Sequence, residues 1–253
     1  MPDHSPALAF ECVTKRFGAT TAVDAVSLDI AGGSFVALVG TSGSGKSTLL
    51  KTINRLIEPS DGRVTIDGTD VATGPAPDLR RRIGYVFQNI GLFPHMTIAE
   101  NIAIGLRIAG RAQDARIDDL LDLVDLPRAI AGRLPDALSG GQRQRVGIAR
   151  ALAPGAKLLL LDEAFGALDP VTRDALGTRI RDLHDRLGLT TILVTHDMAE
   201  ALLLADRVLV MKAGRIVADA TPADLVAGKG GDDAQALVQV PRAQAERLQA
   251  LVA

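Results

Sequence analysis

The chain has 253 residues, with 28 Lys plus Arg against 30 Asp plus Glu, one Cys and no Trp. That length is enough for one large domain or two small ones, each with a buried core. The net charge of −2 and the absence of a long basic stretch argue against nucleic-acid binding. A single Cys excludes an internal disulfide framework and is typical of a reducing compartment.

The apolar segments are too short for a membrane span. A spanning helix needs roughly 20 mostly apolar residues, whereas the strongly apolar runs at 35–39 and 158–161 have the length of buried strands. The first six residues lack the basic and apolar regions of a signal peptide. We therefore expect a cytoplasmic protein, and its membrane association, if any, to come from docking on a membrane partner.

The first third alternates β-branched runs with turns and predicts strands at 23–30, 35–39 and 64–66. A Gly-rich loop follows the second of these strands, and apolar residues at helical spacing over 49–56 then predict a helix. Residues 92–152 have helical periodicity. They predict a helical subdomain inserted between strands.

Strands and helices alternate again from Lys157 onward. Continuous apolar runs at 158–161 and 191–194 are typical of a parallel sheet covered on both faces. A helix reaching Asp185 is predicted between them. This alternation predicts an α/β fold with a parallel sheet.

The last part of the chain predicts a hairpin and two helical segments. Runs at 208–211 and 215–218 flank a Gly-containing turn and read as the hairpin. Thr221, followed by Pro222, predicts a capped short helix. The Gly-rich stretch 228–233 predicts a linker to a short helical tail.

The pattern Gly-x4-Gly-Lys-Ser at 40–47 is a P-loop. Its glycines let backbone N–H groups close around phosphate oxygens, Lys46 reaches the β- and γ-phosphates, and the Ser47 hydroxyl is a Mg²⁺ ligand. Its position between a predicted strand and a predicted helix favours phosphate binding over an accidental Gly-rich turn. The candidate ATP-binding residues of this loop are Gly40, Thr41, Ser42, Gly43, Ser44, Gly45, Lys46, Ser47 and Thr48.

Two acidic residues, Asp162 and Glu163, follow the leucines of the strand predicted at 158–161. Asp162 is expected to hold Mg²⁺ through the Ser47 site, and Glu163 to polarise the water that attacks the γ-phosphate. An acidic pair after a strand is often only the start of a helix. The P-loop upstream favours the catalytic interpretation.

The string Leu-Ser-Gly-Gly-Gln at 138–142 begins an amphipathic helix. It predicts a second phosphate-binding helix N-terminus, at which Ser139 and the N–H groups of Gly140 and Gly141 face an anion. Gln142 completes the string. The alternative is a capped helix start with flexible glycines and no ligand.

Together these motifs resemble the ATP-binding subunit of an ABC transporter over nearly all of residues 8–228. In that family the segment 138–142 is the signature motif, which meets the nucleotide held by the P-loop of a second subunit. The resemblance implies ATP and Mg²⁺ as cofactors and a head-to-tail dimer with two ATPs at its interface. It also implies transmembrane permease subunits as partners, a solute-binding protein as an indirect one, and a peripheral location on the inner face of the cell membrane.

The resemblance also implies the fold. It is a P-loop NTPase core with a parallel sheet, an N-terminal antiparallel β subdomain and an inserted α-helical signature subdomain. Residues 1–228 would form the ATP-binding domain, with the helical subdomain at about 92–152. Residues 229–253 would form the linker and the short helical tail.

Four further positions match family motifs. Gln88 matches the Q-loop residue that reaches Mg²⁺ and the lytic water, while its loop contacts the membrane subunit. Asp169, in Ala167-Leu168-Asp169, matches the D-loop and implies communication across the dimer. His196 matches the switch histidine that hydrogen-bonds the γ-phosphate, and Phe17 matches the aromatic residue that stacks on adenine.

Structural explanations compete with each of these four assignments. Gln88 and His196 also fit ordinary strand ends, Asp169 a helix cap before Pro170, and Phe17 the edge of a core. The resemblance favours the functional role in every case. It assigns Glu163, His196 and Gln88 to catalysis and Ser47, Gln88 and Asp162 to the metal.

Residues 54–62 and 80–98 resemble importers of osmoprotectants such as glycine betaine, carnitine, choline or proline. They lie on the face expected to receive a membrane subunit, so they indicate the partner more than the solute. Many members of that group continue into a regulatory pair of domains. With the sequence ending at Ala253, we do not expect sensing of ionic strength by that route.

Three alternatives remain at this stage. An importer ATPase for another small solute, such as an amino acid, would carry nearly identical motifs. A non-transport ABC ATPase is disfavoured, because it would be expected to have a long coiled-coil insertion or a second nucleotide domain and this sequence shows neither. A GTPase or small-molecule kinase is disfavoured by the signature string and by the lack of an Asn-Lys-x-Asp motif.

Overall fold

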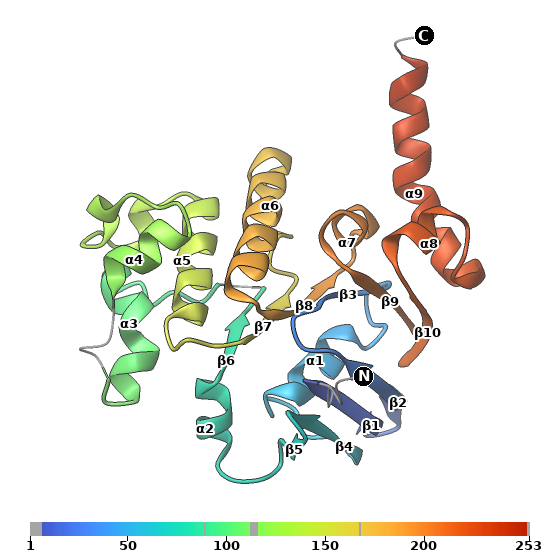
Figure 1. Cartoon of the computed structure of the whole chain (residues 1–253), viewed down its shortest axis with the longest axis horizontal. Coiled ribbons are helices and arrows are strands. Elements are labelled where there is room, and N and C mark those ends of the chain that lie inside the picture. The colour runs from blue at the N-terminus through green and yellow to red at the C-terminus, as the bar shows by residue number, and fades with distance from the viewer. Residues whose placement is uncertain (1–6, 89, 112–115, 167, 252–253) are drawn as a thin grey trace. The chain divides into compact units, whose positions relative to one another are not determined.

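The computed structural model describes residues 7–88, 90–111, 116–166 and 168–251 (Figure 1). The chain divides into two compact units. Unit 1 comprises residues 1–73 and 192–253, and unit 2 comprises residues 74–191. In the described part of the chain no helix is both long and apolar enough to cross a membrane.

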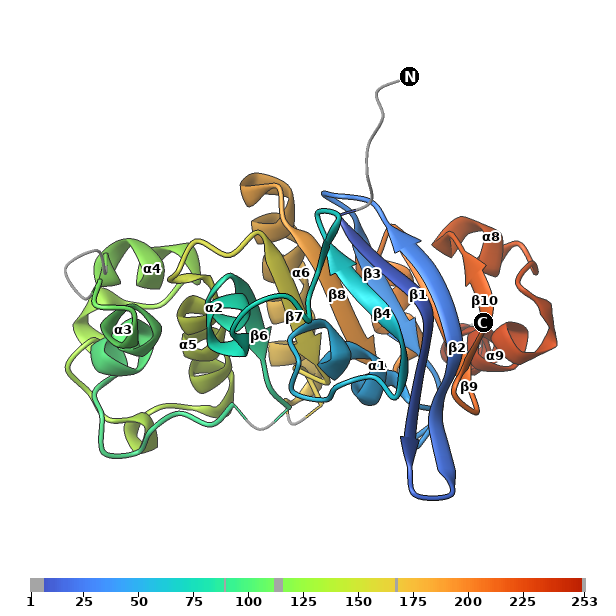
Figure 2. The same cartoon turned by 90° about the horizontal axis from the view of Figure 1, so that it is seen from below.

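Unit 1 contains an antiparallel sheet near the N-terminus. Its strands, in the order β2-β1-β4-β5, are β2 (Thr20–Ile30), β1 (Leu8–Phe17), β4 (Asp61–Ile66) and β5 (Thr69–Asp70). Strand β1 pairs antiparallel with both β2 and β4, and the strands lie side by side in Figure 2. This sheet is the antiparallel β subdomain that the sequence motifs imply.

The sequence did not predict β1, and a β-bulge explains why. Cys12 has a left-handed backbone with φ 50°, and the register of β1 against both neighbours shifts around it. A bulge adds one residue and breaks the two-residue alternation of buried and exposed side chains. The periodic signal that identifies a strand is therefore lost in the middle of β1.

The second group of strands in unit 1 contains the buried strand β3 (Phe35–Val39), which pairs parallel with β9 (Arg207–Lys212). The predicted hairpin is confirmed, since β9 pairs antiparallel with β10 (Arg215–Ala220). Strand β8 (Thr190–Thr195) lies next to β3 where it enters this unit. The parallel pairing of β3 with β9 agrees with the parallel sheet expected from the sequence.

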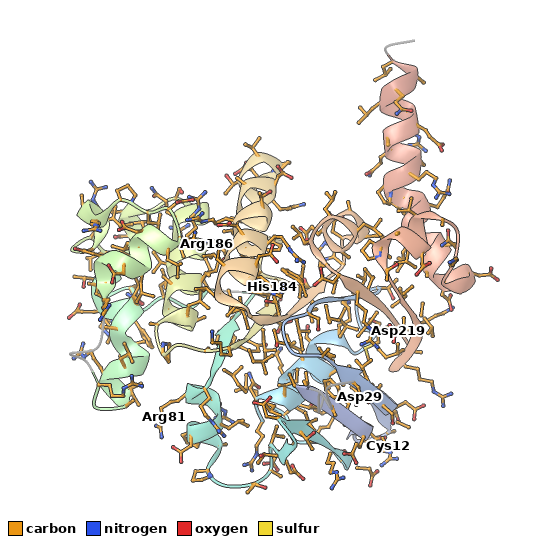
Figure 3. The ribbon with its side chains drawn as sticks, viewed as in Figure 1. Cys12, Asp29, Arg81, His184, Arg186 and Asp219 are labelled. Carbon is orange, nitrogen blue, oxygen red and sulfur yellow. The ribbon has the colours of Figure 1, made fainter. Side chains whose placement is uncertain are left out.

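Arg207 joins the two groups of strands in unit 1. Its guanidinium donates to the carbonyl oxygen of Asp29, at 2.6 Å, and to the carboxylate of Asp219. Asp29 and Asp219 are labelled in Figure 3. The arginine therefore connects the end of β2 to the hairpin strand β10.

Helix α1 (Lys46–Ile53) follows β3 after the Gly-rich loop. Leu49, Leu50 and Ile53 are buried, and they line a small apolar cavity together with Phe10 of β1 and Leu209 of β9. The predicted helix was too long, because α1 ends at Ile53 and Leu56 lies beyond it with 42% of its surface exposed.

The C-terminal part of unit 1 is helical, with α7 (Met198–Leu204), α8 (Pro222–Val226) and α9 (Gly231–Ala250). Thr221 caps α8 as expected, accepting a hydrogen bond from the Asp224 N–H at 3.2 Å. Helix α9 begins inside the stretch predicted as a linker and has 20 residues. The Gln235 side chain donates to the carbonyls of Leu225 and Lys229, which fastens the start of α9 to the turn before it.

Unit 2 combines two parallel strands with helices. Strand β6 (Ile83–Val86) pairs with β7 (Leu158–Asp162), and α2 (Ala76–Arg81) precedes β6. The helices that follow are α3 (Ile98–Ile108), α4 (Ile117–Leu123), α5 (Gly140–Leu152) and α6 (Pro170–Leu187), with 3₁₀ turns at Arg128–Ile130 and Pro135–Ala137. Helices α3, α4 and α5 lie within residues 92–152, the range expected to be helical (Figure 1).

Candidate active site

The P-loop of unit 1 connects β3 to α1, and neighbouring backbone fixes its shape. A β-carbon at Gly40 would overlap the carbonyl oxygen of Met211 in β9. Gly45 has φ 105°, and a β-carbon there would overlap the carbonyl oxygen of Ala22 in β2. Only glycine fits at these two positions, because it has no side chain to displace the adjoining strands.

Lys46 is folded across the loop that precedes it. Its side-chain ammonium donates to the carbonyls of Gly40 at 2.8 Å and Thr41 at 3.0 Å, and it lies 3.5 Å from the Ser44 hydroxyl. The residue is only 5% exposed. A positive charge is thus held within the P-loop, beside the start of α1, where Gly45 provides no side-chain cap. Helix N–H groups without an intrahelical partner and a fixed cation together favour an anion.

Two further predicted residues belong to the same unit as the P-loop. Phe17 ends β1 with 51% of its surface exposed, and the Lys15 ammonium lies 5.1 Å from its ring centroid while donating to the carbonyl of Glu58. The Phe17 ring is therefore about half exposed at the end of the strand. His196 directly follows β8 and is exposed.

Asp162 is the last residue of β7 in unit 2 and is 4% exposed. Its Oδ2 accepts a hydrogen bond from the Tyr85 hydroxyl at 2.8 Å. Burial is the main cause, and the Asp162 carboxylate the second, of a raised pKa at Tyr85. Sequence reasoning missed this contact, although Tyr85 pairs with Leu160 in the neighbouring strand and so lies beside the face that carries Asp162.

Glu163 follows the strand in a left-handed conformation with φ 49°. This backbone turn, rare for a residue with a side chain, lies where the chain leaves β7. The Gln88 amide Nε2 donates to Glu163 Oε2 at 3.2 Å. The structure therefore brings together two of the three residues that the sequence assigned to catalysis.

The start of α5 is capped by the signature string itself. Ser139 Oγ accepts from the Gln142 N–H at 3.2 Å, and Gln142 Oε1 accepts from the Ser139 N–H at 3.0 Å. This capping box matches the alternative explanation of the string, in which it is a capped helix start. Gly140 and Gly141 form the first turn, whose N–H groups have no partner within the helix. A β-carbon at Gly141 would overlap the Thr172 side chain of α6.

Asp169 caps α6, which is the structural role that the sequence offers as an alternative to the D-loop role. Its Oδ1 accepts from the Thr172 N–H at 3.0 Å, and Pro170 occupies the first turn. The backbone hydrogen bond from Thr172 is the main cause of a lowered pKa at Asp169. Ala167, the first residue of the predicted D-loop string, lies outside the described residues.

The predicted metal ligands suit Mg²⁺ in their chemistry. Ser47, Gln88 and Asp162 all offer oxygen atoms, which this cation prefers. Within the described residues no group of three or more His, Cys, Asp or Glu side chains is placed to hold a metal ion. Mg²⁺ commonly binds through one or two carboxylates together with substrate phosphates. Oxygen donors of this kind suit a metal that arrives with a nucleotide.

The partly buried hydroxyl of Tyr85 gives a direct prediction. Because its pKa is raised above the usual value of about 10, the folded protein should retain this proton at a pH where an exposed tyrosine ionises. Raising the pH above about 10 should therefore favour unfolding, since only the unfolded chain releases the proton. Tyr85 is the only tyrosine in the sequence, so tyrosinate absorbance against pH, with and without denaturant, measures it alone. Identical titration curves would contradict both the partial burial of this hydroxyl and its contact with Asp162.

Comparison with known proteins places the chain in a family. The model of the family described as ABC transporter matches residues 23–166. The chain is 48% identical over 223 residues, 87% of its length, to the glycine betaine/carnitine/choline transport ATP-binding protein OpuCA of Bacillus subtilis, of which 59% is covered. It is 48% identical over 228 residues, 89% of its length, to the glycine betaine uptake system ATP-binding protein YehX of Escherichia coli, of which 74% is covered.

A relative named for a different solute is equally similar. The sulfate/thiosulfate import ATP-binding protein CysA of Caulobacter vibrioides is 50% identical over 222 residues, covering 85% of this chain and 65% of CysA. The chain spans only part of several of these relatives. It covers about 56–59% of the length of the OpuCA proteins of Bacillus subtilis and Listeria monocytogenes and of the choline transport ATP-binding protein OpuBA of Bacillus subtilis.

A solved structure confirms the fold. The dimeric bacterial ABC transporter cassette MJ0796 matches with a TM-score of 0.75 and 33% identity, covering 85% of this chain and 98% of that one. The α/β fold expected from the motifs, with its antiparallel β subdomain, parallel strands and helical subdomain, is thereby confirmed. With the family model matching more than half of its residues, the chain belongs to the ABC transporter family.

Proposed function

We propose that this chain is the ATP-hydrolysing subunit of an ABC importer that takes up osmoprotectants such as glycine betaine, carnitine, choline or proline. The observation that carries hydrolysis is the hydrogen bond from Gln88 to Glu163 at the end of a buried strand. It joins the proposed general base to the residue proposed to contact the metal and the lytic water. Family membership and the names of OpuCA and YehX support the transport role.

In this proposal, some of the residues bind ATP and Mg²⁺ and others act in hydrolysis. Lys46 and the backbone of the P-loop bind the phosphates, and Phe17 stacks on adenine, a contact that contributes about 0.5–1.5 kcal/mol. Ser47, Asp162 and Gln88 hold Mg²⁺, which supplies charge neutralisation on the phosphate oxygens when bound. Glu163 takes a proton from the attacking water.

His196 donates a hydrogen bond to the γ-phosphate in this proposal. Its exposed position directly after β8 supports that role, since an exposed side chain is accessible to a ligand. With Lys46 and Phe17, it belongs to unit 1. Glu163, Gln88 and Asp162 belong to unit 2.

Two copies of the chain are proposed to act together, head to tail. Ser139, Gly140, Gly141 and Gln142 would contact the nucleotide held by the partner copy, and Asp169 would contact the partner. The first-turn N–H groups at Gly140 and Gly141 support anion binding. The similarity to MJ0796, whose structure is described as dimeric, supports the assembly.

Solute recognition is proposed to reside on partner subunits. A site for a quaternary amine typically needs a cage of aromatic faces, and this chain has one Tyr, six Phe and no Trp. The Tyr85 hydroxyl donates a hydrogen bond to Asp162, and Phe17 is proposed to contact adenine. Permease subunits would hold the ATPase at the inner face of the cell membrane, with a solute-binding protein as an indirect partner.

The domain boundaries stay part of the proposal. Residues 1–228 would form the ATP-binding domain, and residues 229–253 would form the C-terminal extension that includes α9. An importer of another small solute is the second candidate, favoured by the 50% identity to the sulfate/thiosulfate relative CysA.

Solute-stimulated ATP hydrolysis tests the proposed function. The chain would be reconstituted in liposomes with its permease and binding protein, and phosphate release measured with betaine, carnitine, choline, proline, sulfate or other amino acids. We expect stimulation by at least one osmoprotectant and none in a complex that carries Glu163→Gln. Stimulation by sulfate alone, or only by an amino acid other than proline, would contradict the osmoprotectant assignment.

A further inference from the structure

Helix α5, which begins at the signature string, is hydrogen-bonded near its other end to the segment that follows Gln88. Arg150 Nη1 donates to the carbonyl oxygen of Gly91 at 2.9 Å, and Nη2 donates to the carbonyl oxygen of Ile90 at 2.5 Å. A guanidinium presents its N–H donors in a rigid planar fork. One side chain of α5 thus binds two consecutive backbone carbonyls of this segment.

The helix and the segment also pack directly against each other. Gly147 lies one turn before Arg150, and a β-carbon there would lie 2.8 Å from Cγ2 of Ile90. The Arg150 guanidinium is partly buried in this contact, and burial lowers its pKa. A charged group away from water depends on its hydrogen-bond partners, so losing them is costly.

The same segment leads to the proposed general base. Ile90 and Gly91 are two and three residues beyond Gln88, whose amide donates to Glu163. All of these residues belong to unit 2. A displacement of α5 would therefore act through Arg150 on the backbone at Ile90 and Gly91, and a displacement of that backbone would act on α5.

We propose that Arg150 is a positioning residue that fixes the backbone at Ile90 and Gly91 against α5, so that the helix carrying the signature string sets the hydrogen bond between Gln88 and Glu163 of its own subunit. This role rests on the proposed ATP hydrolysis. It adds a mechanical link inside one subunit to the contacts expected between two.

Arg150→Met tests the link, with Arg145→Met as a matched control. Arg145 is on the same helix and also donates to a backbone carbonyl, that of Asp125 at 3.2 Å. Because Arg150→Met removes both hydrogen bonds to this backbone, we expect it to lower kcat for ATP hydrolysis about tenfold, with KM for ATP within about twofold. Arg145→Met should retain the wild-type kcat. A wild-type kcat in Arg150→Met would overturn the proposal.

A double-mutant cycle with Gln88→Ala separates positioning from general loss of structure. If Arg150 acts through Gln88, Arg150→Met should lower kcat by less than about twofold once Gln88 is already alanine. The same tenfold loss in both backgrounds would overturn the proposal. Arg150→Lys keeps the charge and should give an intermediate kcat. If circular dichroism shows that Arg150→Met does not fold, Arg150→Lys takes its place in the cycle.

Hydrogen exchange distinguishes failure of this link from failure of the proposed function. The amides of Gln88, Ile90 and Gly91 should exchange faster in Arg150→Met than in the wild type or in Arg145→Met, whether or not ATP is hydrolysed. Unchanged exchange there would overturn the link while leaving ATP hydrolysis intact. If exchange is faster in Arg150→Met but the wild-type protein hydrolyses no ATP, the link stands, whereas the proposed function and the catalytic consequence of the link are overturned.

Discussion

Replacing Glu163 by Gln is expected to slow ATP hydrolysis by about 10²–10⁴-fold, the usual range for loss of a general base. Glutamine has nearly the same shape but accepts no proton from water at neutral pH. The substitution keeps a side-chain oxygen that can accept the hydrogen bond from the Gln88 amide. The variant should therefore retain the local geometry while losing the proton acceptor.

Nucleotide binding separates this chemical defect from a structural one. Glu163→Gln should bind a fluorescent ATP analogue with wild-type affinity, since the phosphate-binding groups are elsewhere. Glu246→Gln, which neutralises an exposed carboxylate on α9, is the matched control and should leave turnover unchanged. Undiminished turnover in Glu163→Gln would remove Glu163 from the role of general base.

Lys46→Ala should abolish nucleotide binding at concentrations that saturate the wild type. The ammonium is held in the P-loop by the carbonyls of Gly40 and Thr41, and it is the cation expected to meet the β- and γ-phosphates. Hydrogen bonds to charged groups contribute about 1.5–3 kcal/mol each. Loss of several such bonds to phosphate oxygens is enough to prevent saturation. Equilibrium binding of a fluorescent ATP analogue measures the effect.

Two further variants show whether the loss of binding comes from the lost charge or from a change in structure. Lys51→Ala removes a lysine from the last turn of the same helix and should bind nucleotide normally. Lys46→Met keeps an unbranched apolar stem in the buried position, so it should fold like the wild type by circular dichroism and still fail to bind. Wild-type affinity in Lys46→Met would show that the charge is dispensable and would contradict the phosphate-binding role.

Sequence reasoning could propose those site residues that belong to short continuous patterns. The P-loop, the acidic pair after β7 and the signature string each have their informative residues within a few positions. Tyr85 and Arg150 escaped it because their partners are distant along the chain. The Tyr85 and Asp162 bond spans 77 residues, and the Arg150 bonds span 59 and 60. Nothing in the local pattern around either residue indicates such a partner.

The elements show the same division between local and distant causes. Continuous apolar runs correctly predicted β3, β7 and β8. The bulge at Cys12 hid β1, and the extent of α1 was overestimated because Leu56 continued the apolar spacing beyond the end of the helix. Helix α9 begins among glycines that locally favour a linker, yet Ala234 and Val238 are buried against the rest of unit 1. Tertiary packing outweighs local propensity there.

The contact between Gly40 and Met211 has a consequence for the order in which the protein becomes competent during synthesis. The P-loop at residues 40–47 is synthesised early, whereas β9, the strand against which it packs, is synthesised much later. A nascent chain that has emerged only as far as α1 lacks one wall of its phosphate loop. We therefore expect ribosome-bound chains to acquire nucleotide affinity only after β9 has left the exit tunnel, so that ATP cannot stabilise the early folding steps of its own binding site.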